Sequence, residues 1–247
     1  MNMIKGLMRK ILETQGYSVT RLSPPDMSQK FLALHDKVKM FTMTSVERQY
    51  ALYQSIRYVV DVGIAGDIVE CGVWKGGSTM LAALTLMELG ITNRNLYLFD
   101  TFAGMSEPSD KDVNIHGSSA KGKWHTLLRG VINEWDYASL EEVKQNMYTT
   151  GYPKEKISFV VGKVEDTIPQ AAPDKIAILR LDTDWYESTK HELDNLFPRL
   201  VQGGVLIIDD YGHWQGARRA VDEYIAEHKI RLLLNRIDYT GRIAVKI

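Results

Sequence analysis

The chain has 247 residues, of which 45% are hydrophobic and 25% charged, as is usual for a folded globular protein. Its 30 basic and 31 acidic residues give a net charge of −1, which excludes a bulk positive field for binding nucleic acid or an anionic membrane. A single cysteine excludes an intramolecular disulfide and a cysteine-based zinc or iron–sulfur site.

The N-terminal residues are predicted to form an amphipathic helix, because apolar side chains recur every three or four positions. These are Ile4, Leu7, Met8, Ile11 and Leu12. The stripe favours packing on its own domain or on a second copy; a membrane surface or another partner is the alternative. The basic residues Lys5, Arg9 and Lys10 argue against a signal peptide, and no apolar run reaches about 18 residues. We therefore expect a cytoplasmic protein that forms a homodimer or a larger homo-oligomer.

Residues 1–62 are predicted to form a helical extension, and residues 63–247 the main domain. A second helical region within the extension runs from about Gln29 to Val62. Inside it, the sequence Thr-Ser-Val-Glu from Thr44 to Glu47 has the form of a capping box. A helix is therefore predicted to begin there, with Thr44 as its cap.

After Gly66 the pattern changes to strands that alternate with helices. The strands are apolar on both faces, which indicates a parallel sheet with helices on both sides. The predicted strands are Asp67–Val73, Asn95–Thr101, Lys156–Gly162, Lys175–Asp184 and Val205–Tyr211. The predicted helices are Ser78–Gly90, Tyr186–Leu200 and Gln215–Lys229. The fold class is therefore α/β.

Two segments depart from this alternation. Arg231–Ile237 and Arg242–Ile247 are joined by a short connection that ends in Gly241, which predicts an antiparallel hairpin. Residues 103–152 form a long polar stretch, and long insertions in compact α/β domains are usually functional. We expect this insertion to cover the carboxyl ends of the strands as a lid or substrate wall. A surface excursion or a dimer arm is the alternative.

The turn after the first predicted strand is rich in glycine. It extends from Glu70 to Ser78, and its glycines let the backbone turn sharply and pass close to a ligand. Its spacing matches neither the dinucleotide-binding motif nor the P-loop. The second strand ends at Asp100, whose carboxylate could accept hydrogen bonds from a ribose diol or could cap the next segment. Together the turn and the acid favour a nucleoside, because ligands of open α/β sheets bind beyond the carboxyl ends of the strands.

Four aspartates follow the fourth and fifth predicted strands. Asp182 and Asp184 point to the same side if the chain there is extended, and Asp209 and Asp210 follow the neighbouring strand. Carboxylates this close repel one another unless some are protonated or a cation lies among them, and oxygen ligands favour Mg²⁺, Mn²⁺ or Ca²⁺. Single acids could instead cap the following helices. His213 follows Asp210 by three residues. It could act as an acid–base group, but a single histidine at such a position is more commonly structural.

Four motifs resemble the macrocin O-methyltransferase family, which includes the mycinamicin and novobiocin sugar methyltransferases. They lie at Met43–Arg48, Gly66–Ser78, Leu179–Thr189 and Gly203–Tyr211, and the resemblance extends from about residue 41 to 247. It implies a class I methyltransferase that depends on S-adenosylmethionine (SAM) and on Mg²⁺, with Mn²⁺ as a possible substitute. The implied fold is a Rossmann-like sheet of seven strands, one of them antiparallel.

The resemblance also implies roles for individual residues. Those expected near the cofactor are Glu70, Gly72 and Ser78 for its methionine part, Asp100 for its ribose, Val164 for its adenine, and Thr42 with Thr44. Asp182, Asp209 and Asp210 would bind Mg²⁺, and Asp184 would be the general base. Family members act on deoxysugars of natural products, so the implied partner is a sugar or glycoside, with no nucleic acid and no membrane.

Other kinds of protein share parts of this pattern. An apolar strand followed by Asp-x-Asp also occurs in haloacid dehalogenase-type phosphatases, but there it normally follows the first strand, whereas Asp182 follows the fourth. A glycosyltransferase could use Asp182 and Asp184 for the cation of a sugar nucleotide, yet it gives no role to Asp209 and Asp210. A non-enzymatic binding module gives no reason for four acids at one edge of the sheet.

Overall fold

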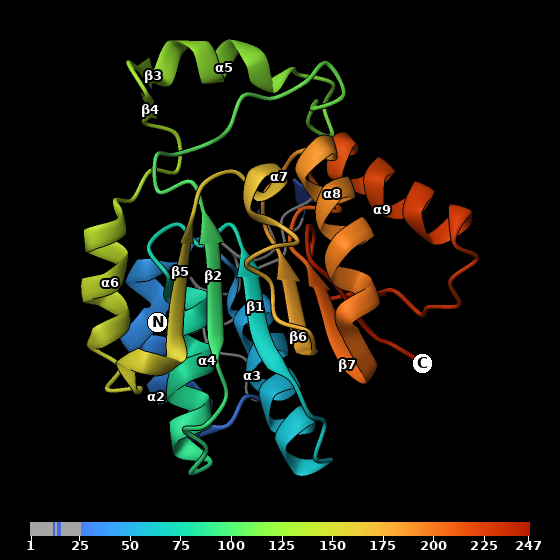
Figure 1. Ribbon diagram of the computed structural model, residues 1–247. Helices are drawn as coiled ribbons and strands as arrows, with labels where there is room; N and C mark the ends of the chain where they lie inside the picture. Colours follow the sequence, from blue (N-terminus) through green and yellow to red (C-terminus); the bar gives the residue numbers. More distant parts are fainter. Residues whose placement is uncertain (1–11, 13, 16–25) are drawn as a thin grey trace.

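The computed structural model describes Leu12, Thr14, Gln15 and residues 26–247 (Figure 1). Apart from Leu12, the apolar stripe of the predicted N-terminal helix lies outside the described residues. Within the part of the chain that the structure describes, no helix has the length and apolar character needed to cross a membrane.

A sheet of seven strands, in the order β5-β2-β1-β6-β7-β9-β8, forms the centre of the molecule. The strands are β1 (Asp67–Cys71), β2 (Leu96–Asp100), β5 (Ile157–Val161), β6 (Ile176–Leu181), β7 (Leu200–Ile208), β8 (Asn235–Arg236) and β9 (Arg242–Val245). In this spatial order, the neighbouring strands β5, β2, β1, β6 and β7 are parallel, whereas β9 is antiparallel to both β7 and β8. The α/β class, the single antiparallel strand and the C-terminal hairpin are confirmed.

Helices cover both faces of this sheet (Figure 1). One face carries α2 (Gln29–Val38), α3 (Val46–Asp61), α4 (Gly77–Glu88) and α6 (Leu140–Tyr148), and the other carries α7 (Val164–Thr167), α8 (Tyr186–Leu196) and α9 (Gln215–Glu227). Side chains of a strand alternate between faces, so β1 places Ile68 in the first core and Val69 and Cys71 in the second. The strands that carry the predicted site residues are thus held from both sides.

Helix α3 begins one residue later than the sequence predicted. Ser45 is its N-cap and accepts a hydrogen bond from the backbone N–H of Arg48, so the prediction of a capping box with Thr44 as the cap is wrong. The hydroxyls of Thr44 and Thr42 instead lie 2.9 Å apart. The Ser45 hydroxyl also donates to Asp238, which fastens the start of α3 to the turn between β8 and β9.

The insertion of residues 103–152 has two parts. Helix α6 packs against the sheet layer like the other helices. The remainder holds α5 (Ala120–Leu127) and a small hairpin of β3 (Leu128–Arg129) and β4 (Ile132–Asn133), which lie above the carboxyl ends of the strands (Figure 1). This remainder is joined to the sheet by three buried tryptophans, Trp135, Trp185 and Trp214, whose ring centroids lie 5.0 to 6.0 Å apart. Closure of this part as a lid stays a prediction.

Candidate active site

A cavity of about 530 Å³ opens beyond the carboxyl ends of β1, β2, β6 and β7. It is lined by ten of the predicted site residues: Thr42, Thr44, Glu70, Gly72, Ser78, Asp100, Asp182, Asp184, Asp209 and Asp210. Val164, the remaining one, begins α7 and lines an adjoining cavity of about 60 Å³. The two cavities share Gly72, Asp100 and Asp182, so residues from distant parts of the sequence meet at one end of the sheet.

The glycine-rich turn after β1 passes close to the chain after β6. Gly72 has a φ of +78°, and a Cβ atom at this position would lie 2.0 Å from the backbone oxygen of Asp182. A side chain is therefore excluded both by the left-handed backbone and by the neighbouring chain. The absence of a side chain at Gly72 is what allows the two turns to approach each other.

Asp100 ends β2 and accepts hydrogen bonds from the turn after β1 and from the turn after β2. Its Oδ2 accepts from the backbone N–H groups of Val73 at 2.8 Å and Trp74 at 3.3 Å, and its Oδ1 accepts from that of Phe102 at 2.7 Å. Burial raises the pKa of Asp100 above its usual value, against these N–H donors, which lower it. Asp100 thus has the capping role that the sequence left as one alternative, and ribose binding by the same carboxylate stays a prediction.

The acidic cluster combines side chains from the ends of β6 and β7. Carboxylate oxygens of Asp182, Asp209 and Asp210 lie within 4.8 Å of one another. Burial raises the pKa of Asp182 and of Asp210 well above the usual range, and the other carboxylates raise it further. Three oxygen donors at this spacing fit a hard divalent cation such as Mg²⁺ or Mn²⁺.

Asp184 lines the cavity, but its backbone conformation differs from the predicted one. The strand predicted to extend to Asp184 ends at Leu181, and Asp184 has a φ of +67°, so the prediction of an extended chain there is wrong. Burial raises the pKa of Asp184 to about 7, although hydrogen bonding with Asp210 lowers it. A carboxyl group with a pKa near neutrality is suited to accept a proton at physiological pH.

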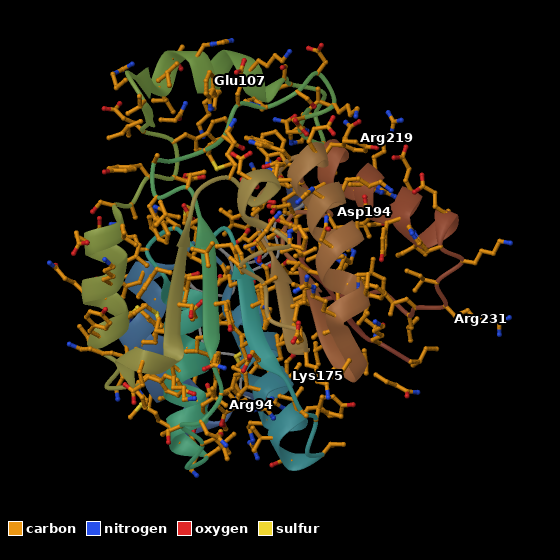
Figure 2. The ribbon with its side chains drawn as sticks, viewed as in Figure 1. Arg94, Glu107, Lys175, Asp194, Arg219 and Arg231 are labelled. Atoms are coloured by element: carbon orange, nitrogen blue, oxygen red, sulfur yellow. The ribbon has the colours of Figure 1, made fainter. Side chains whose placement is uncertain are left out.

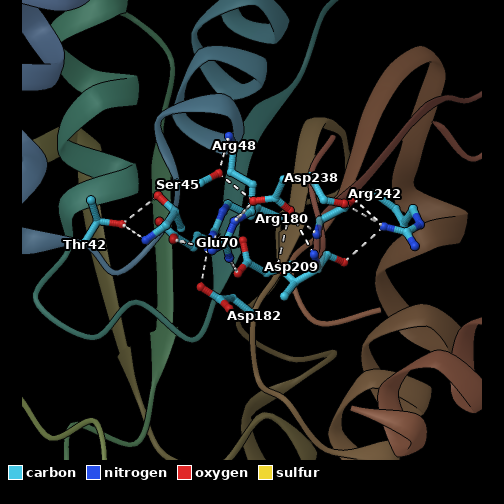
Figure 3. Close-up of polar contacts among 12 residues, drawn as sticks. Thr42, Ser45, Arg48, Glu70, Arg180, Asp182, Asp209, Asp238 and Arg242 are labelled. Carbon is cyan, nitrogen blue, oxygen red and sulfur yellow. Dashed lines mark hydrogen bonds and ion pairs between the residues drawn. The ribbon is translucent and has the colours of Figure 1, made fainter. Parts of the chain in front are cut away.

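Arg180, for which the sequence motifs predicted no role, lies at the centre of the acidic side chains (Figure 3). It is 4% exposed, and its Nη1 donates to Oε1 of Glu70 at 2.7 Å and to Oδ2 of Asp182 at 2.6 Å. Its Nη2 donates to Oδ1 of Asp209. The sequence did hold a signal, because Arg180 interrupts an apolar strand, and a charge buried in a strand needs buried partners.

A second arginine, Arg48 of α3, also contacts the cluster. It donates to Oδ2 of Asp209 and, at 3.0 Å, to Oδ2 of Asp238 (Figure 3). Both oxygens of Asp209 therefore accept from an arginine, one from β6 and one from α3. The motif around Met43–Arg48 is thus connected to the acidic cluster as well as to the cavity wall.

The upper wall of the cavity comes largely from the insertion. Its residues there are Gly104, Met105, Asn114, Ser118, Ser119, Ala120, Lys123, Trp135 and Asp136. Asp136 has a φ of +50°, and its charge contributes to raising the pKa of Asp184. His213 also lines the cavity, where its Nδ1 lies 2.7 Å from the hydroxyl of Tyr239. The wall combines aromatic and polar side chains, opposite an acidic floor.

Comparison with known proteins gives consistent matches. The chain matches the model of the macrocin-O-methyltransferase (TylF) family over residues 1–245. It is 32% identical over 247 residues to the 8-demethyl-8-(2,3-dimethoxy-alpha-L-rhamnosyl)-tetracenomycin-C 4'-O-methyltransferase of Streptomyces olivaceus, covering 95% of this chain and 89% of that protein. It is also 32% identical over 200 residues to the mycinamicin III 3''-O-methyltransferase of Micromonospora griseorubida, covering 81% of this chain and 76% of that protein.

Solved structures agree with this match. The O-methyltransferase NovP is similar with a TM-score of 0.73 and 32% identity, over 83% of this chain and 82% of its own. The calicheamicin methyltransferase CalS11 shares the fold with a TM-score of 0.63 at 17% identity, over 93% of this chain and 98% of its own. The predicted class I methyltransferase fold is confirmed. These matches do not support the phosphatase alternative.

Proposed function

The chain belongs to the macrocin O-methyltransferase family and is an O-methyltransferase, and we propose that it transfers the methyl group of SAM to a sugar hydroxyl of a natural-product glycoside. The observation that carries the proposal is the cavity in which the glycine-rich turn, Asp100 and the four aspartates meet. In the named relatives, the methylated compounds are a rhamnosyl-tetracenomycin and mycinamicin III.

The two adjoining cavities suggest how SAM would lie. Asp100 and Gly72 line both of them, so the ribose would sit at their junction, with the adenine beside Val164 in the smaller cavity. The methionine part would extend into the larger cavity towards Ser78 and Thr42. Glu70 lines this cavity too, but its oxygens already accept from Arg180 and from the hydroxyl of Thr79, which gives it a supporting position.

The acidic cluster would hold the cation, through Asp182, Asp209 and Asp210. When bound, Mg²⁺ would supply Lewis acidity that lowers the pKa of the acceptor hydroxyl. Asp184 lines the same cavity and would take the hydroxyl proton. The hydroxyl oxygen would then form a bond to the methyl carbon while the bond from this carbon to the sulfonium sulfur breaks, and S-adenosylhomocysteine (SAH) would leave.

A transfer assay tests the acceptor class. The protein is incubated with SAM, Mg²⁺ and one of two glycosides, mycinamicin III or methyl α-L-rhamnoside. We expect a product heavier by one CH₂, with the added methyl on the sugar, because the cavity places an oxygen-chelating cation site beside a base. Mass spectrometry and fragmentation locate the methyl group.

A catechol such as caffeic acid serves as the matched acceptor without a sugar. Transfer to the catechol and to neither glycoside would contradict the sugar assignment. Release of phosphate from p-nitrophenyl phosphate in the absence of SAM would contradict the proposed reaction as a whole.

A further inference from the structure

We propose that Arg180 is a positioning residue that fastens the cofactor side of the site to the cation side, so that the two ligands depend on one guanidinium. The identities of these ligands rest on the proposed function. The connection itself rests on contacts among three neighbouring strands, β1, β6 and β7 (Figure 3).

The sheet register places Arg180 between its partners. Glu70 of β1 is the direct parallel neighbour of Arg180, so both side chains leave the same face of the sheet. On the other side, Ile207 of β7 is the register partner of Arg180, and Asp209 follows it by two residues. Nη1 of Arg180 bridges Glu70 and Asp182, while Nη2 holds Asp209. One planar group therefore hydrogen-bonds both to the strand that begins the glycine-rich turn and to two of the expected cation ligands.

Loss of the ion pairs that Arg180 forms with Glu70 and Asp209 would be energetically costly, because these side chains are buried. Glu70, Asp209 and Arg180 are each 4% exposed, and buried carboxylates that lose their cationic partner are strongly destabilised. Burial raises the pKa of Glu70, and the charge of Arg180 counteracts this rise. The guanidinium has a rigid fork of N–H donors, whereas a lysine ammonium is a single point on a flexible chain. A lysine at this position would keep the charge but could not hold all three carboxylates in place.

The substitution Arg180→Lys keeps the positive charge but removes the planar set of N–H donors. Binding of Mn²⁺ and of SAH is measured separately by titration calorimetry on the full chain. We expect the Kd for Mn²⁺ to rise about tenfold, because groups that orient metal ligands commonly contribute that much to metal affinity. We also expect weaker SAH binding, because Glu70 loses its partner below the glycine-rich turn. The stoichiometry of both ligands should stay at that of the wild type.

Arg94→Lys is the matched control at the opposite end of the sheet (Figure 2). Arg94 also uses both terminal nitrogens, donating at 2.6 Å to the backbone oxygens of Gly66 and Ile64. Its replacement should lower the melting temperature without changing either Kd. Unchanged Kd values in Arg180→Lys, with only a lower melting temperature or a lower active fraction, would overturn the inference and leave Arg180 a structural residue.

A second pair of variants keeps the inference testable if Arg180→Lys does not fold. Glu70→Gln and Asp100→Asn each remove a carboxylate from the cofactor side, but only Glu70 contacts Arg180. Glutamine keeps an acceptor oxygen but removes the negative charge that pairs with Arg180. We therefore expect weaker Mn²⁺ binding in Glu70→Gln and wild-type Mn²⁺ binding in Asp100→Asn. Equal Mn²⁺ affinity in both variants would refute the connection. A wild-type protein that does not bind SAH would instead contradict the proposed function.

Discussion

Asp184→Asn is expected to lower the turnover number on the order of 10²–10⁴-fold, the range typical for loss of a general base. Asparagine has nearly the same shape as aspartate but cannot accept the proton of a hydroxyl. Asp184 lies outside the group of three carboxylates that come within 4.8 Å of one another, and asparagine can still form a hydrogen bond with Asp210, so the affinity for Mg²⁺ should change little. Turnover is measured at saturating SAM and acceptor over a series of Mg²⁺ concentrations.

Asp136→Asn is a fitting control for this variant. Asp136 lines the same cavity and also has a left-handed backbone, with a φ of +50°, but it belongs to the upper wall. Its replacement should lower the turnover number far less than Asp184→Asn does, because it leaves the Asp184 carboxylate in place. If excess Mg²⁺ restores the activity of Asp184→Asn, then Asp184 is a cation ligand, and the base has been assigned to the wrong aspartate.

Removal of divalent cations with EDTA is expected to abolish methyl transfer, and Mg²⁺ or Mn²⁺ should restore it. The reason is the donor set of Asp182, Asp209 and Asp210, which fits a hard cation beside the acceptor. Asp210→Asn gives the sharpest test among the three ligands, because Asp182 and Asp209 also form ion pairs with Arg180. Its activity should be low at the Mg²⁺ concentration that saturates the wild type and should recover partly at higher concentrations.

The same titration run on the wild type provides the reference curve. Binding of SAH should survive EDTA in both proteins, because the glycine-rich turn follows β1 and Asp100 ends β2, whereas the cation ligands follow β6 and β7. Full transfer activity of the wild type in EDTA would reject the cation site.

The fold was largely predictable because its strands carry strong local signals. The residues Ile178, Leu179 and Leu181 of β6 are all buried, as a central parallel strand requires, and the apolar run before Asp182 indicated this directly. The carboxyl ends of such strands meet at one edge of the sheet, so the order of the strands alone was enough to bring Asp182 and Asp209 together. For these residues, local pattern and global fold agree.

The remaining features depend on contacts between distant segments. The wall above the cavity is held by Trp135, Trp185 and Trp214, which no periodicity connects. Asp184 has a left-handed backbone, which the strand pattern before it did not indicate. The bridging role of Arg180 follows from the register among β1, β6 and β7. A sequence pattern indicates the structure of one helix or strand, whereas the tryptophan cluster and the Arg180 contacts each involve two or three elements.

Binding of SAH to the cavity beyond β1 and β2 is the property on which the proposed function depends most directly. Titration calorimetry with SAH, in buffer containing EDTA, measures it without any knowledge of the acceptor. We expect one binding site with a Kd in the micromolar range for the wild type. In Asp100→Ala we expect weaker binding, because Asp100 lines both cavities and holds the turn after β1. Absence of binding by the wild type at millimolar SAH would contradict the assignment of this cavity to SAM.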